Sequence, residues 1–387
     1  MSTRVLIFLS HYLPGYKAGG PLQSIANLVD QLGDEFDFRI VTRDRDVGDR
    51  EPYESLDASE WHQVGKAKVR YLAPSQLSLW SIARLLRETP HDIVYFNSFF
   101  DPRFTTLPLF ARRLKLCPAE PAILAPRGEF SAGALKLNSA KKRAFFVASQ
   151  CIRLHSNLFW QASTAYEADD IRRTIRSKAH FIRIAPNLPR FPGSNEIKHQ
   201  MRNTEDPLRI VFLSRISPKK NLLFALRVLE TVQTPVILSI YGPQEDKDYW
   251  DECALAISRL PKHIGVRYCG ALKPAEVISV LSQHDLFFLP TLGENYGHVI
   301  VEALQAGLPI LISDQTPWRA LGKYGVGQDL PLGNKQAFSR YIDDFAQQSP
   351  DQVSKLRQRI KEFLISHAKT SDTASAYRAL FSIERGQ

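Results

Sequence analysis

The sequence has few cysteines, and none of them belongs to a pattern typical of a metal site or a disulfide framework. Cys117, Cys151, Cys253 and Cys269 form no CxxC pair and no cysteine/histidine set at zinc spacing. We therefore expect reduced thiols, as in a cytoplasmic protein, and no bound metal.

The sequence also lacks a long apolar run and several well-known functional signatures. The apolar run at Arg4–Ser10 is too short to span a bilayer, and no small-residue cleavage site follows it, so it predicts a first strand. The absence of a GxSxG turn argues against a hydrolase. The absence of RNA-binding, zinc-finger and helix-turn-helix signatures argues against nucleic acid as a partner.

The composition is that of a folded globular protein. The 387 residues are 44% hydrophobic and 23% charged, and this length suits two domains of roughly 150 to 200 residues each. Fifty basic against forty acidic residues give a net charge of +10. Between Arg112 and Arg183, 14 Lys or Arg against 5 Asp or Glu leave a net +9. The first half therefore carries a basic surface suited to phosphorylated or anionic partners.

Two segments open alike and predict two domains of related architecture. RVLIFLS at Arg4–Ser10 and RIVFLS at Arg209–Ser214 are each followed by a loop and an amphipathic helix. In the second half, helices near 248–258, from Pro274 and over 297–306 alternate with predicted strands at Val236–Gly242, Ile264–Gly270, Asp285–Pro290 and Leu308–Ser313. This short cycle is typical of a parallel α/β sheet whose ligand edge lies at the carboxyl ends of its strands.

A proline-rich stretch at Pro186–Pro207 separates the two halves. We expect an N-terminal Rossmann-like domain over 1–188, a linker over 189–206 and a C-terminal Rossmann-like domain over 207–366. The residues from Pro350 look helical in two pieces with a break near Lys369–Asp372. The C-terminal helix over 367–387 either closes the second domain or crosses back to the first.

Two loops after predicted strands suit the binding of an anion. Gly19 and Gly20 precede a helix, where the absence of side chains permits close backbone approach and the helix start offers N–H groups. In SRISPKKNL, directly after the strand that opens the second domain, Arg215 and Lys220 are placed to neutralise a diphosphate.

A third loop, PTLGENYGHVIVEALQAGLPILIS, carries the strongest signal in the chain. Glu294 follows a strand, and Glu302 lies eight residues later within an apolar helical run, where a carboxylate needs a partner. Eight residues of helix rise about 12 Å, roughly the reach from a ribose across a diphosphate to a sugar. Backbone N–H groups at Tyr296–Val299 would face the diphosphate.

These segments resemble the phosphate-binding and EX7E motifs of the retaining glycosyltransferases of the large family four, the group 1 glycosyltransferases. The similarity extends in the family's order through GYKAGGPL, APRGEF, QASTAYEADDI, APNLP and TPWRAL. It implies the GT-B fold, an α/β architecture of two Rossmann-like doubly wound domains that face each other across a cleft. The first domain would hold the acceptor and the second the nucleotide-sugar.

The resemblance also implies a role for each matching residue. Arg215 and Lys220 would stabilise the leaving diphosphate, Glu294 would meet the sugar hydroxyls and Glu302 would hold the ribose. Gly19 and Gly20 would lie beside the phosphates, and the substrate-binding loop would comprise Asn295, Tyr296, Gly297, His298 and Val299. Many relatives have a histidine after the strand at Asp92–Phe100, where this chain has Asn97 and Ser98, so Asn97 is the candidate for that contact.

The function expected is retaining, metal-independent transfer of a hexose-type sugar, with no cofactor. The donor would be a UDP- or GDP-linked nucleotide diphosphate-sugar, and the acceptor a glycan or lipid-linked glycan in surface polysaccharide biosynthesis. The alternatives are a GT-B-like nucleotide-sugar epimerase and a non-catalytic nucleotide-sugar-binding module. The metal-binding interpretation of the DxD triplets at Asp44–Asp46 and Asp246–Asp248 is disfavoured, because both resemble charged loops or helix starts.

A basic helix predicted at Ser139–Ile152 leaves two interpretations open. Its Lys-Lys-Arg start beside Phe145 and Phe146 suits peripheral contact with an anionic membrane, at the cytoplasmic face. A solvated helix packed by its aromatic face fits equally well.

Overall fold

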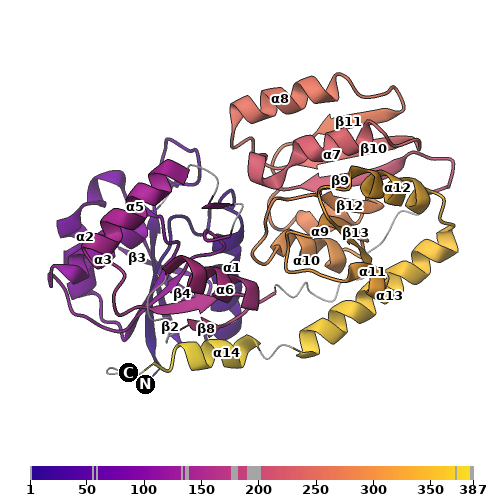
Figure 1. Ribbon diagram of the computed structural model, residues 1–387. Coiled ribbons are helices and arrows are strands. Elements are labelled where there is room, and N and C mark those ends of the chain that lie inside the picture. The colour runs from indigo at the N-terminus through magenta and orange to yellow at the C-terminus, as the bar shows by residue number, and fades with distance from the viewer. Residues whose placement is uncertain are drawn as a thin grey trace. The chain divides into compact units, whose positions relative to one another are not determined.

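A computed structural model describes residues 2–54, 56–57, 60–131, 134–135, 139–175, 182–189, 202–370 and 373–383. The chain divides into two compact units, Met1–Arg190 with Asp372–Gln387, and Phe191–Ser371. Figure 1 draws the part of the first unit before residue 190 in indigo to magenta, its C-terminal helix in yellow, and the second unit in pink to yellow. Most of the linker predicted at 189–206 lies outside the described residues.

The first unit is built on a sheet with the strand order β3-β4-β2-β1-β5-β6-β7-β8. β3 pairs antiparallel with β4, and the other pairings are parallel. The elements of this unit are β1 Arg4–Phe8, α1 Gly20–Leu32, β2 Asp37–Arg43, β3 Trp61–Val64, β4 Ala67–Leu72, η1 Pro74–Gln76, α2 Leu79–Glu88, β5 Ile93–Asn97, η2 Pro102–Thr106, α3 Leu107–Arg113, β6 Ala122–Ala125, α5 Ser139–Cys151, β7 Phe159–Ala162, α6 Ala165–Ile175, β8 Ile182–Ile184 and α14 Thr373–Leu380.

Both faces of this sheet are buried under helices. Along β1, Val5 and Ile7 join a core cluster with residues of α1 and α14, whereas Leu6 and Phe8 join a second cluster with residues of α2, α3 and α6. Successive side chains of a strand point to opposite faces, so these two clusters cover the two sides of one sheet. The first unit is therefore doubly wound, and α14 from the chain's C-terminal part completes one of its layers.

The second unit repeats the architecture in a smaller sheet with the order β11-β10-β9-β12-β13-β14 and parallel pairings. Its elements are β9 Leu208–Leu213, η4 Pro218–Lys220, α7 Leu222–Leu229, β10 Val236–Tyr241, α8 Lys247–Ile257, β11 Ile264–Tyr268, α9 Val277–Leu281, β12 Leu286–Leu289, α10 His298–Gln305, β13 Ile310–Ser313, α11 Leu321–Tyr324, β14 Gly327–Leu330, α12 Lys335–Ala346 and α13 Pro350–Thr370. The strand order places β9 beside β12 and thereby fixes which loops meet at the carboxyl edge.

The same ion pair opens the central sheet of each unit. In the first unit the Arg4 side chain donates from Nε and Nη2 to the two carboxylate oxygens of Asp92, at 3.0 and 2.7 Å. In the second unit Arg209 makes the same two bonds to Asp285, at 2.9 and 2.7 Å. Each aspartate also accepts the backbone N–H of its arginine. The bidentate pair therefore fixes the register between the first strand of each unit and the strand that begins after the aspartate.

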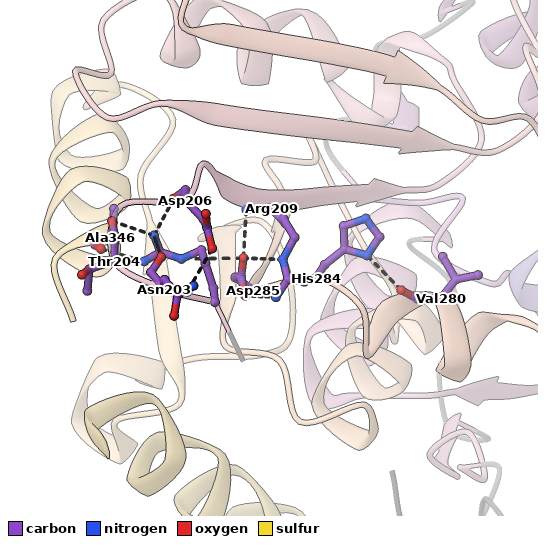
Figure 2. A network of polar contacts seen from close by, with 9 residues as sticks. Asn203, Thr204, Asp206, Arg209, Val280, His284, Asp285 and Ala346 are labelled. Atoms are coloured by element: carbon purple, nitrogen blue, oxygen red, sulfur yellow. Dashed lines mark hydrogen bonds and ion pairs between the residues drawn. The ribbon is translucent and has the colours of Figure 1, made fainter. Parts of the chain in front are cut away.

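A buried histidine precedes the aspartate in both units. His91 Nδ1 contacts the Thr89 carbonyl at 2.6 Å, and His284 Nδ1 contacts the Val280 carbonyl at 2.8 Å. Burial lowers the pKa of both rings. Figure 2 shows the second-unit version, with His284 on one side of the Arg209–Asp285 pair. The internal repeat therefore extends from the strand sequence to the polar contacts at the amino ends of the strands.

β10 ends at Tyr241, one residue before the predicted end, because Gly242 has φ +135°. A Cβ atom at this position would lie 1.9 Å from the Ser214 carbonyl oxygen. The loop after β10 can therefore pass closely behind the loop after β9 only with glycine at this position.

Candidate active site

Three loops interlock at the carboxyl edge of the second sheet. The loop after β9 contacts the loop after β12 through Leu292 N–H, which donates to the Lys219 carbonyl at 2.8 Å, and through Asn221 Nδ2, which donates to the Pro290 carbonyl at 2.9 Å. The loop after β12 contacts the loop after β13 through Glu294 N–H, which donates to the Gln315 carbonyl at 3.0 Å. The edge is therefore held by backbone contacts that fix the predicted site residues.

Lys220 and Glu294 form an ion pair within this edge. Their side chains are only 13% and 12% exposed. Burial alone would raise the pKa of Glu294, but the charges of Lys220, Lys219 and Arg215 outweigh burial and hold that pKa below its ordinary value. The glutamate is therefore held as a carboxylate beside a cluster of cations.

Arg215 lies after β9 but pairs with a different carboxylate. Its Nη1 donates to Glu245 Oε1 at 2.5 Å, and both side chains are more than a third exposed. Glu245 comes from the loop after β10, the strand on the other side of β9. Arg215 still acts electrostatically on Glu294. The two predicted cations thus come to the same sheet edge, each beside its own glutamate.

The start of α10 is shaped by a glycine and an aromatic contact. Gly297 precedes the helix with φ +78° and no side chain caps the first turn. The Trp318 indole donates to the Tyr296 carbonyl at 2.7 Å, and the Tyr296 ring lies edge-on to His298 at 4.8 Å. The positive end of the helix dipole therefore lies beside the loop that carries Glu294.

The structure places Glu294 in the loop after β12 and Glu302 in α10, as expected, but the predicted rise of about 12 Å counted all eight residues between them as helical. Because α10 begins only at His298, Glu294 lies in a loop and Glu302 lies about one turn into the helix. The helical part of their separation is therefore a rise of about 6 Å rather than 12 Å. Glu302 is also half-buried rather than enclosed, among the buried neighbours Val301 and Ala303. Its expected role at the ribose stays a prediction.

The predicted glycine loop of the first unit lies directly before α1. Gly19 has φ +76° and precedes the helix, and Gly20 is its exposed first residue. The loop is organised by Asp46, which accepts the N–H groups of Tyr16 and Lys17 at 2.8 and 3.1 Å. A carboxylate of one DxD triplet therefore binds backbone in the fold.

The other DxD triplet likewise has a structural role, since Asp246 caps α8 by accepting the Tyr249 N–H at 3.0 Å. Within the described part of the chain, no group of three His, Cys, Asp or Glu side chains is placed to hold a metal ion. No helix of that part is long and apolar enough to cross a membrane.

The strand expected at Asp92–Phe100 is the shorter β5, so Asn97 is its last residue at the carboxyl edge of the first sheet, and its side chain is bonded to a neighbouring residue. It is 3% exposed, and Oδ1 accepts from Arg127 Nε and Nη2 at 3.0 and 2.6 Å. Arg127, in the APRGEF segment, lies at this edge beside Asn97, and the sequence analysis did not single it out. Asn97 as a direct sugar contact stays a prediction.

α5 packs by its aromatic face. Phe145 and Phe146 lie against Phe99 and Phe100 inside the first unit, with ring centroids 5.1 to 5.6 Å apart. Of the large apolar residues of this helix, Val147 is exposed at 58%. The two phenylalanines therefore belong to the core rather than to a membrane-facing surface.

The second unit matches a known protein family. Residues 194–364 match the family model of the glycosyl transferases, group 1. This range contains Arg215, Lys220, Glu294 and Glu302. No curated protein matches the sequence.

The whole chain is similar in fold to several solved glycosyltransferase structures. HepE of Anabaena, solved in complex with UDP and glucose, is 13% identical, with a TM-score of 0.69 and 98% of each chain covered. WaaG, a glycosyltransferase involved in lipopolysaccharide biosynthesis, is 13% identical, with a TM-score of 0.64 and coverage of 99% and 100%. A trehalose-6-phosphate protein from E. coli, bound with UDP-2-fluoro glucose, is 9% identical, with a TM-score of 0.69 and coverage of 99% and 100%. The likeness over both units shows the same GT-B fold.

Proposed function

Because residues 194–364 match the family model of the glycosyl transferases, group 1, and the chain has the GT-B fold, we propose that the protein is a retaining, metal-independent glycosyltransferase. It transfers a hexose-type sugar from a UDP- or GDP-linked donor to a glycan or lipid-linked glycan acceptor. The similar folds of HepE with UDP and glucose and of WaaG in lipopolysaccharide biosynthesis support a UDP-sugar donor and a surface polysaccharide pathway.

The observation that carries the proposal is the buried Lys220–Glu294 pair at the carboxyl edge of the second sheet. An ammonium placed beside the start of α10 offers a diphosphate both a charge and the positive end of a helix dipole. When a diphosphate takes the place of Glu294 on Lys220, the carboxylate becomes available to hydroxyl groups of the transferred sugar. Arg215 would bind the same diphosphate after its hydrogen bond to Glu245 breaks.

The chemistry follows from where negative charge develops. As the bond from the anomeric carbon to the diphosphate breaks, charge accumulates on the diphosphate oxygens, and Lys220 and Arg215 stabilise it. The leaving oxygen then accepts the acceptor's proton on the same face of the sugar, which retains the anomeric configuration. Two protein cations serve the leaving group, so the proposed reaction requires no divalent metal.

The acceptor belongs to the first unit, and the basic surface of that unit supports contact with an anionic membrane. On α5, Lys141 and Arg143 are exposed while Phe145 and Phe146 face the core. The contact proposed is therefore electrostatic, at the cytoplasmic face, and weakens as salt is added.

The test is thermal stabilisation of the full chain by UDP, GDP, ADP and CMP and by their sugar conjugates, with and without EDTA. A shift with one nucleoside diphosphate that persists in EDTA and is lost in Lys220→Ala supports the proposal. A shift that requires manganese contradicts metal independence. Absence of any shift, together with absence of sugar release from UDP- and GDP-sugars, rejects the donor class.

Product analysis separates the enzyme classes. Incubation with the stabilising donor and a mixture of glycan acceptors yields a new α- or β-glycoside whose anomeric configuration matches the donor. Conversion of the donor sugar into its epimer without acceptor supports the epimerase instead. Stable donor binding without either product supports a binding module.

A further inference from the structure

Arg127 lies directly after β6 and is held in an unusual position. Its backbone has φ +55°, a left-handed conformation that arginine rarely adopts. Its Nη2 donates to the Tyr95 hydroxyl at 2.9 Å, and its Nη1 donates to Asn187 Oδ1 at 2.6 Å, in addition to the two bonds to Asn97. The guanidinium is therefore fixed by side chains from β5 and from the segment after β8.

All of these partners are neutral. Among the described residues no ion pair joins Arg127 to a carboxylate within 4.0 Å. Glu167, a carboxylate whose charge acts on Arg127, already accepts the N–H groups of Gly128 at 2.6 Å and Ser163 at 2.7 Å. A largely enclosed guanidinium without a carboxylate partner retains its attraction for an anion.

Three other carboxylates of this edge are also engaged by backbone N–H groups, and a fourth, Asp44, pairs with the Arg45 side chain. Asp101 accepts from Arg103 and Phe104, and Glu129 accepts from Phe99 at 2.5 Å. Asp46 holds the loop before α1, as described above. The acidic side chains are thus used to fix loops and do not form ion pairs with Arg127.

A second guanidinium and an unused amide lie at the same edge. Arg43 ends β2, and its guanidinium lies over the Phe104 ring, 5.5 Å from the ring centroid. Among the described residues, Arg43 forms no ion pair and its Nε has no hydrogen-bond partner. Asn97 Nδ2 is buried and has no partner in the described part of the chain, because the amide is turned with Oδ1 toward Arg127. The strand order β2-β1-β5-β6 places these groups along one edge.

We propose that this edge of the first unit binds an oxyanion, a phosphate or a carboxylate, of the acceptor at Arg127, with Asn97 as its positioning residue. The inference rests on the proposed function, in which the first unit takes the acceptor, and it restricts the acceptor to anionic saccharides. Four of the five N–H groups of Arg127 already donate to Asn97, Tyr95 and Asn187, so an oxyanion would accept from the remaining N–H on Nη1 and be held mainly by the charge of the guanidinium. Arg43 adds positive potential along the edge.

The test measures binding of three probes to the full chain by saturation-transfer NMR and calorimetry: glucose 6-phosphate, glucuronate and glucose. Saturating UDP occupies the diphosphate site of the second unit, and Lys220→Ala serves as a parallel sample in which that site is weakened. We expect the anionic probe that carries the correct group to bind at least about 10-fold more tightly than glucose, equivalent to about 1.4 kcal/mol. Preference for glucose 6-phosphate indicates a phosphate, and preference for glucuronate indicates a carboxylate.

Arg127→Gln should abolish this preference, whereas Arg113→Gln, an exposed change on α3, should keep it. Arg127→Gln also removes donors from three buried partners, so Asn187→Asp provides a variant that preserves the contacts. It places a carboxylate at the 2.6 Å contact with Nη1 and neutralises the guanidinium where it lies. We expect Asn187→Asp to remain folded by circular dichroism and to bind the anions no more tightly than glucose.

Equal binding of glucose and both anions by the wild type, or unchanged anion preference in Asn187→Asp, overturns the inference. The proposed function has its own readout, because UDP binding depends on Lys220 in the second unit. If the wild type does not bind UDP but still prefers an anionic probe to glucose, only the proposed donor site is rejected. Retained UDP binding without anion preference rejects the oxyanion site alone.

Discussion

Lys220 and Glu294 are 74 positions apart in the sequence and pair because β9 and β12 are neighbours in the second sheet. The Glu294 carboxylate forms an ion pair with the Lys220 ammonium, the same group that would bind a diphosphate in the proposed function. The charge of Lys220 is therefore neutralised within the protein, and in the proposed function donor binding would replace one anion by another instead of filling an uncompensated positive site. A buried ammonium remains paired in both states, which avoids the free-energy penalty of an isolated charge.

Substitution of this pair should affect catalysis more than folding. We expect Lys220→Ala and Glu294→Ala each to lower turnover about 100-fold or more, because each removes a contact to the reacting groups. Glu302→Ala should mainly raise the KM for the donor. Steady-state kinetics with the stabilising donor measures both constants. Lys323→Ala, an exposed change on α11, is the control, and wild-type turnover in Lys220→Ala or Glu294→Ala contradicts the assignment.

Release of Arg215 should tighten donor binding. Glu245→Gln removes the carboxylate that accepts from Arg215 at 2.5 Å, so the guanidinium no longer has to exchange partners. The pair is solvent-exposed, and we expect a decrease in the Kd for the nucleoside diphosphate of only about 2- to 5-fold. Calorimetric titration at low and high salt measures it. A weaker donor affinity in Glu245→Gln shows that Glu245 positions Arg215 instead of competing for it.

Acid should weaken the first unit through Asp92. The hydrogen bond from Arg4 lowers the pKa of this carboxyl from 3.8 to about 2. The folded state therefore binds fewer protons than the unfolded state, and the stabilisation is complete above about pH 4 and is lost as the pH falls toward 2. Asp92→Asn should flatten the pH dependence of thermal unfolding in this window, and the exposed change Asp251→Asn should not. Parallel curves for the wild type and Asp92→Asn refute this assignment.

The C-terminal part of the chain should stabilise the first unit. Tyr377 and Phe381 are each 1% exposed, and the Phe381 ring lies 5.3 Å from Phe36 and 5.7 Å from Tyr95. We expect Phe381→Ala to lower the free energy of unfolding of the first unit by about 3 to 5 kcal/mol. Hydrogen exchange read separately in β1 and β9 measures the effect. Equal loss of protection in both units contradicts the prediction.

The sequence predicts the strand–loop–helix cycles and the residues at the second sheet's edge because both depend on local patterns. Apolar runs bounded by polar turns identify the strands, and Lys220 and Glu294 follow two such runs directly. The partners of these residues depend on strand order. Glu245 meets Arg215 because β10 lies on the other side of β9.

The sequence did not predict the direction of several side chains, because the local pattern is compatible with more than one direction. Phe145 and Phe146 are adjacent on α5, and only packing shows that both face the core rather than solvent. The strand predicted over Asp92–Phe100 ends at Asn97, and the direction of the Asn97 amide is set by Arg127, 30 positions away. The His-Asp doublets at His91 and His284 are visible in the sequence, and their meaning requires knowledge of which strands are neighbours.

The position of α14 has a consequence for how the protein forms during synthesis. α14 belongs to the first unit but is translated after every element of the second. Its Arg378 pairs with Glu35 at 2.7 and 2.8 Å, although the two residues are 343 positions apart in the sequence. During translation, all residues of the second unit are synthesised before α14. Until α14 is made, the first unit lacks the helix that covers part of one face of its sheet. The first unit begins first along the chain and therefore completes its apolar layer only after the whole second unit has been made.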